Sequence, residues 1–230
     1  RDLHSFPTRR SSDLIGGVSK DLANSAHAGK GAYFVIEADE YDRMFLGLMP
    51  HIAIITNVEY DHPDCYPTPA DYRAAFADFV KLLPEDGLLV VCKDDEHGSK
   101  LVSAVKPGTR VVTFGYSDDA DYQAINVQTN SVGGFDYNLV DHFKNATIAH
   151  VSLQIPGTHN ARNSIAILAV LNELCFPVER AAENLSRFTG TGRRFDVIGE
   201  VGGVTIVDDY AHHPSRSEEH TSELQSPNTI

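Results

Sequence analysis

The stretch HIAIITNVEYDHPDCYPTPADYRAAFADFVKLLPEDGLLVVC, residues 51–92, has the pattern of a strand, a helix and a second strand. Its first and last parts, residues 51–57 and 87–92, are short apolar runs rich in β-branched side chains, which is typical of buried strands. Short apolar runs that alternate with helical periodicity favour a parallel or mixed sheet covered by helices. The stretch therefore predicts an α/β fold.

The middle of this stretch predicts a helix over residues 69–83. Thr68 suits the N-cap, Pro69 suits the first helical position, and Asp71 is the acidic residue three positions after the cap. Pro84 and the turn PEDG then end the helix. The apolar residues that repeat at helical spacing are Tyr72, Phe76, Phe79 and Val80.

The same pattern continues on both sides of this stretch. The order of apolar runs predicts a mostly parallel sheet flanked by helices, with a smaller antiparallel β patch over residues 122–153. Near the C-terminal end, FDVIGEVGGVTIVDDY predicts two strands around a Gly-Gly turn. Further buried strands are expected at residues 32–38 and 110–115, and helices at 96–105, 160–175 and 178–188.

Composition limits the class of protein. The chain has 230 residues and a formal net charge of −13, which argues against a binder of duplex nucleic acid, since that function needs a clustered basic face. An apolar run long enough for membrane insertion and a signal peptide are both missing from the pattern, so a cytoplasmic location is expected. Cys65, Cys92 and Cys175 are far apart, which predicts buried or idle thiols.

The two ends differ from the rest of the chain. Residues 1–14, RDLHSFPTRRSSDL, and residues 216–230 show neither helical nor strand periodicity. Both strings resemble translated sequencing-adapter DNA, and such additions are excluded before the fold is considered. We therefore expect residues 1–14 and 216–230 to be non-native segments, with the natural polypeptide over residues 15–215. Two genuine disordered tails are the alternative.

Two acid-rich strings follow predicted strands, where ligands of open α/β sheets bind. EADEYD, residues 37–42, and TNVEYDHPD, residues 56–64, combine carboxylates with one imidazole and one amide. These groups suit Mg²⁺ together with phosphate oxygens. The alternative is that the acidic residues are solvated loop residues and helix caps.

Two further strings suggest contacts to a nucleotide. In PGTHNARNSIAILAV, His159 and Asn160 stand at the start of an apolar helix, where an anion or a polar heterocycle is favoured. In GTGRRFD, Arg193 or Arg194 suits a phosphate. The alternatives are an N-cap role for Asn160 and solvated arginines. The chain contains no G-x-x-x-x-G-K-[ST] phosphate loop.

The strings IEADEYD, ITNVEYDHPDCY, IPGTHNARNSIAILAV, GTGRRFD and VDDYAHHP, taken in this order, resemble the Mur ligase family and most closely its alanine-adding branch. The resemblance covers residues 15–215. It implies that residues 15–196 form the central ATP-binding domain without its N-terminal phosphate-loop part. Residues 197–215 would begin the C-terminal domain.

The resemblance also implies a chemistry, the ATP-dependent joining of L-alanine to UDP-N-acetylmuramate through an acyl phosphate in peptidoglycan precursor synthesis. ATP and Mg²⁺ are the implied cofactors. His62 and Arg194 would be catalytic, and the given chain, without its phosphate loop, is predicted to be inactive. The implied contacts are Glu37 and His62 with Mg²⁺, Asn160 and Asn163 with adenine, Arg194 with the ATP phosphates, Asp209 with the ribose, and Asn57, Tyr210 and His212 with the muramyl or amino-acid substrate.

Other functions remain open at this point. Phe76 stands about where several relatives have a carbamylated lysine, which fits the alanine-adding branch. The related ligase that attaches a recycled tripeptide usually carries an insertion after EADEYD, which is missing from this chain. A non-catalytic nucleotide-binding module and a simple metal-dependent hydrolase are the further alternatives.

Overall fold

The structure is a computed structural model that describes residues 12–21, 24–192, 194 and 196–209. The described residues divide into two compact units. The larger unit holds residues 39–188, and the smaller unit combines residues up to 38 with residues 189–209. Among the described residues, no helix is long and apolar enough to cross a membrane.

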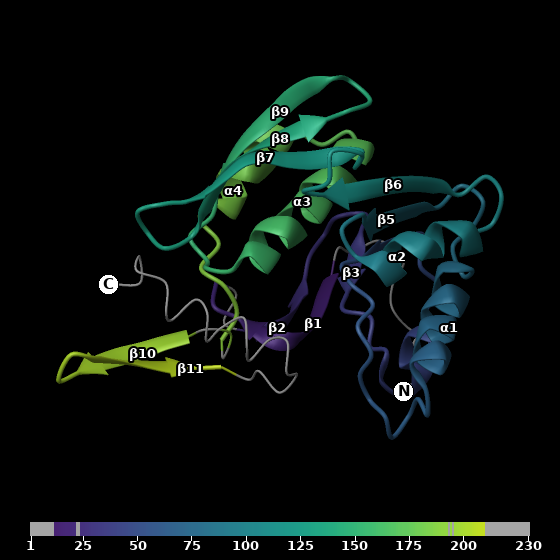
Figure 1. Cartoon of the computed structure of the whole chain (residues 1–230), viewed down its shortest axis with the longest axis horizontal. Coiled ribbons are helices and arrows are strands. Elements are labelled where there is room, and N and C mark those ends of the chain that lie inside the picture. Colours follow the sequence, from purple (N-terminus) through teal and green to yellow (C-terminus); the bar gives the residue numbers. More distant parts are fainter. Residues whose placement is uncertain (1–11, 22–23, 193, 195, 210–230) are drawn as a thin grey trace. The chain divides into compact units, whose positions relative to one another are not determined.

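The larger unit is built on a six-stranded sheet with the strand order β4-β5-β6-β7-β8-β9 (Figure 1). The first four strands are mutually parallel, and β8 and β9 continue the same sheet in antiparallel pairing. The predicted α/β class is therefore confirmed, and the predicted antiparallel patch forms one side of the main sheet. The strands are β4 (Ile52–Ile55), β5 (Leu88–Cys92), β6 (Arg110–Gly115), β7 (Tyr122–Thr129), β8 (Phe135–Asp141) and β9 (Ala146–Ser152).

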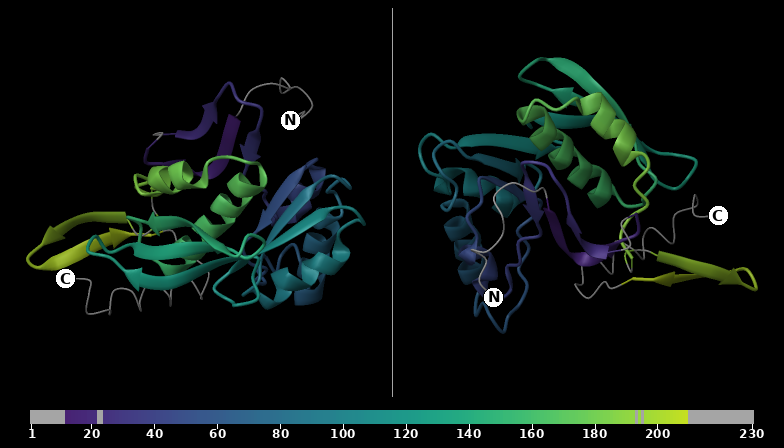
Figure 2. Two further views of the ribbon diagram at one scale, coloured as in Figure 1. Left: turned by 90° about the horizontal axis from the view of Figure 1, so that it is seen from above. Right: turned by 180° about the vertical axis from the view of Figure 1, so that it is seen from behind.

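Helices cover both faces of this sheet (Figure 2). One face carries α3, which contacts β5 to β8, and α4, which contacts β9. The opposite face carries α1 and α2. The helices are α1 (Pro69–Val80), α2 (Glu96–Lys100), α3 (Thr158–Glu173) and α4 (Val178–Leu185), with the 3-10 turns η2 (Tyr41–Gly47) and η3 (Leu101–Ala104).

The predicted capping box of α1 is confirmed. The Thr68 hydroxyl accepts a hydrogen bond from the Asp71 amide at 3.2 Å, and the Asp71 carboxylate accepts one from the Thr68 amide at 3.1 Å. The helix ends at Val80, three residues before the predicted end. The cause is Pro84, because a residue before proline avoids the helical conformation and the chain tightens into turns ahead of it. The helix predicted at residues 96–105 likewise tightens, from α2 into η3.

The core of the larger unit lies between the sheet and α3. All five residues of β5 are buried, as predicted. Ala161, Ile165 and Leu168 of α3 are fully buried in the same cluster as Val90 and Phe114. Since each fully buried aliphatic side chain contributes about 1.5–3 kcal/mol, this contact fixes the start of α3 against the sheet.

The smaller unit contains two small sheets. Strand β1 (Ser12–Ser19) lies between β2 (Asn24–Ala28), its antiparallel neighbour, and β3 (Phe34–Ile36), its parallel neighbour. The strands β10 (Asp196–Val201) and β11 (Val204–Asp208) form a hairpin, as predicted.

The structure differs from the sequence pattern at two places in the smaller unit. Residues 1–14 lack a strand pattern, yet Ser12–Leu14 pair with both neighbours, because backbone hydrogen bonding needs no alternation of side chains. Strand β3 was predicted to be buried, but Phe34 and Val35 are 44% and 57% exposed. The reason is that β3 is an edge strand of a three-stranded sheet, and the described part of this unit contains no helix to cover it.

Candidate functional site

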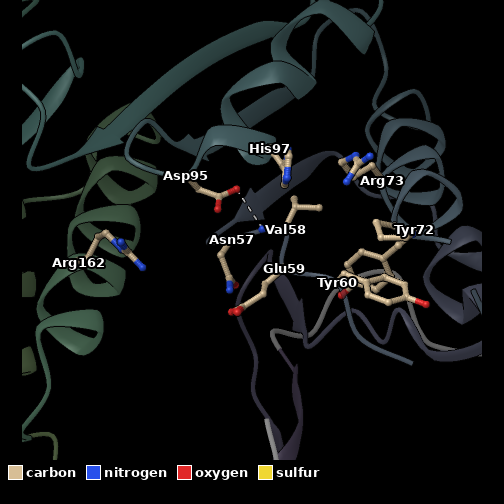
Figure 3. A pocket seen from close by; sticks show the side chains of 10 residues that line it. Asn57, Val58, Glu59, Tyr60, Tyr72, Arg73, Asp95, His97 and Arg162 are labelled. Atoms are coloured by element: carbon tan, nitrogen blue, oxygen red, sulfur yellow. Dashed lines mark hydrogen bonds between the residues drawn. The ribbon is translucent and has the colours of Figure 1, made fainter. Parts of the chain in front are cut away.

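A cavity of about 400 Å³ lies in the larger unit, at the carboxyl ends of β4 and β5 (Figure 3). Ligands of open α/β sheets bind at this edge. The predicted substrate residue Asn57 is part of the wall, and the aromatic and cationic residues were not predicted. The lining residues are Asn57, Val58, Glu59, Tyr60, Pro69, Tyr72, Arg73, Asp95, His97 and Arg162.

Asp95 joins the two loops that border the cavity. Its Oδ1 accepts hydrogen bonds from the backbone nitrogens of Val58, at 3.1 Å, and of Gly98. Asp95 is thereby the N-cap of α2 and also holds the chain that leaves β4. A Cβ at position 98 would lie 2.8 Å from the same carboxylate oxygen, so a larger residue there would displace the end of the Asp95 side chain.

Arg162 reaches the cavity from the second turn of α3. In Figure 3 its side chain points from the helix toward Asn57 and Asp95. Its Nε atom is buried and has no hydrogen-bond partner among the described residues. Burial raises the pKa of Tyr116 to about 12, and the nearby positive charge of Arg162 opposes this rise. A buried guanidinium nitrogen without an acceptor lowers the stability of the fold.

Asp94, two residues after β5, accepts three hydrogen bonds from the turn after β6. Asp94 accepts hydrogen bonds from the backbone nitrogens of Tyr116 and Ser117, at 2.8 and 3.0 Å, and from the Ser117 hydroxyl at 2.7 Å. Asp94 and Arg162 both influence the pKa of Cys92, which burial raises. The oxygens of Asp94 thus hold the turn after β6.

His62 lies on the loop between β4 and α1 with a positive φ of 57°. Its Nε2 atom is 3.3 Å from the Glu40 carboxylate and 3.9 Å from the Asp61 carboxylate. The Tyr41 ring packs edge-on against the imidazole at 5.2 Å. The imidazole is thus held between two carboxylates and an aromatic ring.

The other predicted metal ligand, Glu37, follows β3 in the smaller unit and is exposed. Within the residues that the structure describes, no group of three or more His, Cys, Asp or Glu side chains is arranged to hold a metal ion. The pairing of Glu37 with His62 on Mg²⁺ therefore stays a prediction.

The structure brings residues 39–42 of the first acid-rich string against the second string. The Tyr66 hydroxyl donates to the backbone oxygen of Glu40, and the Tyr41 hydroxyl donates to Asp64 at 2.9 Å. The hydrogen bond to Asp64 is the main cause that raises the pKa of Tyr41 to about 12, and it lowers the pKa of Asp64. These contacts hold the loop that carries His62.

The start of α3 differs from the N-cap alternative for Asn160. The N-cap is Gly157, with φ 95°, and Asn160 lies inside the first turn. The Asn160 side-chain nitrogen donates to the Pro156 backbone oxygen at 2.6 Å, which fixes the direction of the amide. Asn163 is half-buried one turn further along α3.

The remaining predicted residues lie in the smaller unit or outside the described residues. Arg194 is exposed between the last loop and β10, and Asp209 is half-buried directly after β11. Tyr210 and His212 lie outside the described residues. Neither Arg162 nor Asp95 was predicted from the sequence. The signal for Arg162 is a charged residue on an otherwise apolar helix, and the signal for Asp95 is an Asp three residues before a glycine.

Comparison with known proteins gives one consistent result. Residues 15–171 match the Mur ligase middle domain. A UDP-N-acetylmuramate--L-alanine ligase from Caldanaerobacter subterraneus subsp. tengcongensis is 39% identical over 202 residues, which are 88% of this chain and 43% of that protein. A second one, from Geobacter sulfurreducens, is 40% identical over 203 residues, again 88% and 43% of the two chains. The chain thus spans about 43% of the length of these curated relatives.

A solved structure agrees with the sequence relatives. The crystal structure of a UDP-N-acetylmuramate-alanine ligase from Thermotoga maritima has a TM-score of 0.76 and 26% identity, and the match covers 94% of this chain and 48% of that chain. The similarity thus extends to the arrangement of helices and strands.

Proposed function

Because the chain belongs to the Mur ligase family, we propose that it is part of an ATP-dependent enzyme that joins L-alanine to UDP-N-acetylmuramate in peptidoglycan precursor synthesis. The observation that carries the proposal is the 39–40% identity to alanine ligases over 88% of the chain. The cavity at the carboxyl edge of the sheet supports it, since nucleotides and their phosphates bind at this edge in open α/β folds. We assign the reaction to the cytoplasm.

The proposed reaction proceeds in two steps. The substrate carboxylate attacks the γ-phosphorus of ATP, which forms an acyl phosphate and releases ADP. The amine of L-alanine then attacks the acyl carbon, and the tetrahedral intermediate expels phosphate as the amide forms. Such phosphoryl chemistry depends on positioning and on neutralisation of charge rather than on a protein nucleophile.

The metal-binding role falls to His62 and Glu37. The Glu40 carboxylate lies 3.3 Å from the His62 Nε2 atom, and carboxylate oxygens are ligands that Mg²⁺ accepts beside phosphate oxygens. When bound, Mg²⁺ supplies charge neutralisation for those oxygens. The loop contacts of Tyr41 and Tyr66 keep the imidazole in place.

The nucleotide and substrate contacts are proposals as well. The fixed amide of Asn160, with Asn163 one turn later, would hold adenine through hydrogen bonds. Arg194 would contact the ATP phosphates as a catalytic residue, and Asp209 would contact the ribose. On the substrate side, we propose that Asn57, which lines the cavity, acts with Tyr210 and His212 on the muramyl or amino-acid substrate.

We also propose the domain limits expected from the sequence. Residues 15–196 would belong to the central ATP-binding domain and residues 197–215 to the start of the C-terminal domain. Residues 1–14 and 216–230 would be non-native. Reading the genomic sequence on both sides of the gene segment tests these limits, because native flanks would differ from the adapter-like strings and add a G-T-x-G-K-[ST]-like string upstream.

A domain exchange tests the proposed activity. The matching 202 residues of the Caldanaerobacter ligase are replaced by those of this chain, and phosphate release is measured with ATP, UDP-N-acetylmuramate and L-alanine. We expect release that requires L-alanine, and the chimera with His62→Ala serves as the inactive control. A chimera that unfolds cooperatively on heating but releases phosphate without any nucleotide contradicts the proposal and favours a hydrolase.

A further inference from the structure

We propose that Arg162 binds a phosphate-type oxyanion inside the cavity of the larger unit. The proposal rests on the proposed function in one respect, that the phosphate belongs to the nucleotide or to the acyl phosphate. The role is separate from the expected Mg²⁺ and adenine contacts, none of which includes Arg162.

Arg162 carries an unsatisfied hydrogen-bond donor. The Nε atom of Arg162 is buried without a hydrogen-bond partner among the described residues, while its side chain lines an open cavity of about 400 Å³. A guanidinium keeps its charge at every physiological pH. Loss of a proton therefore cannot remove the energetic penalty of the buried donor. The Nε atom is closed off from the cavity, so an anion there would bind the guanidinium end-on, through the terminal nitrogens.

Asp94 and Asp95 accept hydrogen bonds from backbone nitrogens rather than from Arg162. Asp95 Oδ1 accepts two backbone hydrogen bonds, and both oxygens of Asp94 hold the Tyr116–Ser117 turn. In Figure 3 the Arg162 side chain points into the cavity, on the side of Asn57.

The charge of the cavity lining indicates the kind of ligand that fits. The cavity lining contains Arg73 and Arg162 against Asp95 and Glu59, so its formal charge is zero with His97 neutral, in a chain of formal net charge −13. The cavity is therefore much less acidic than the protein as a whole. The planar fork of arginine binds tetrahedral oxyanions with two parallel hydrogen bonds, which favours a phosphoryl group.

The test is a binding series on the whole 230-residue chain by isothermal titration calorimetry. The probes are inorganic pyrophosphate, ATP and adenosine, and the variants are Arg162→Gln, Arg162→Lys and Arg180→Gln. The last variant makes the same charge change at an exposed position of α4. We expect Arg162→Gln to weaken pyrophosphate and ATP roughly tenfold to a hundredfold, because it removes a charged bidentate contact. The affinity of Arg162→Lys should lie between those of Arg162→Gln and the unchanged chain. The affinity of Arg180→Gln should equal that of the unchanged chain.

The outcomes separate this inference from the proposed function. If ATP binds and Arg162→Gln leaves its affinity unchanged, the inference is wrong and the nucleotide proposal survives. If pyrophosphate binding depends on Arg162 but ATP does not compete for it, the inference holds for a phosphoryl group other than that of the nucleotide, and the proposed function is then decided by the product of the chimera. The inference is also wrong if Arg162→Gln weakens the binding of adenosine as much as that of ATP. It is wrong as well if the unchanged chain binds neither pyrophosphate nor ATP.

A second readout distinguishes binding from a structural role. In buffer without phosphate, Arg162→Met should raise the melting temperature, since it removes an unsatisfied buried donor, and pyrophosphate should no longer stabilise the variant. A lower melting temperature for Arg162→Met, with stabilisation by pyrophosphate retained, would show that the arginine serves packing alone.

Discussion

Asp95 and Val58 are joined by a hydrogen bond of 3.1 Å from the Val58 backbone nitrogen to the Asp95 Oδ1 atom. The two residues are 37 positions apart, and the bond ties the N-terminus of α2 to the loop that leaves β4. Because the same oxygen accepts the Gly98 amide, one carboxylate fixes both walls of the cavity.

Loss of this carboxylate should lower stability. We expect Asp95→Ala to reduce the free energy of unfolding by about 1–3 kcal/mol, since it removes an N-cap and leaves a part-buried amide without an acceptor. Urea denaturation measures the change. Asp95→Asn should reduce the free energy of unfolding far less, because an amide oxygen also caps helices. Equal reductions in the two variants would contradict the capping role.

The contact between Arg110 and Glu173 should stabilise the junction of β6 and the end of α3. Glu173 accepts from the Arg110 guanidinium and, at 2.9 Å, from the hydroxyl of the fully buried Tyr122. We expect Glu173→Ala to cost about 2–3 kcal/mol of unfolding free energy, because a buried hydroxyl loses its acceptor. In the same denaturation assay Lys100→Ala, at an exposed ion pair with Glu96, should change stability by less than about 0.5 kcal/mol.

The Tyr41 hydroxyl should lose its proton at a higher pH than an ordinary tyrosine. Its hydrogen bond to Asp64 raises the pKa of Tyr41 from 10.0 to about 12. Since the folded state holds the proton more tightly, this contact stabilises the fold fully below pH 10, and the contribution is lost as the pH rises from 10 through 12. Absorbance difference titration between the chain and Tyr41→Phe should show the missing phenol near pH 12. In Asp64→Asn the pKa of Tyr41 should fall toward 10, and an unchanged value would refute the assigned cause.

The Asn160 amide should matter for nucleotide affinity. In the chimera, we expect Asn160→Ala to raise the KM for ATP roughly tenfold with a smaller change in KM for L-alanine, because one or two hydrogen bonds are lost. Asn184→Ala on the exposed side of α4 is the matched control. An equal rise in both KM values would point to a general disturbance of α3 instead.

Most of the larger unit could be predicted from the sequence because its signals are local. The apolar runs of residues 51–57 and 87–92 and the Thr68–Asp71 capping box depend on near neighbours in the chain, and all appear in the structure. The continuation of the antiparallel strands into the main sheet depends on the pairing of β6 with β7, which the sequence pattern does not encode.

The site could be predicted only in part. Motifs at strand ends marked Asn57 and His62, since ligand positions in this fold class follow from topology. Arg162 and Asp95 come together through tertiary packing of α3 and α2 at one edge of the sheet, and no local pattern links two residues so far apart in the chain. The strand Ser12–Ser19 was missed for a related reason, because backbone pairing leaves little trace in composition.

The most direct test of the proposed function is the product that the chimera makes. Mass spectrometry of the reaction with ATP, UDP-N-acetylmuramate and isotope-labelled L-alanine should show one labelled alanyl group added to the nucleotide sugar. Product should be absent when ATP is omitted. A folded chimera that consumes ATP and adds only a tripeptide, or that yields no labelled product, would contradict the assignment to an alanine-adding ligase.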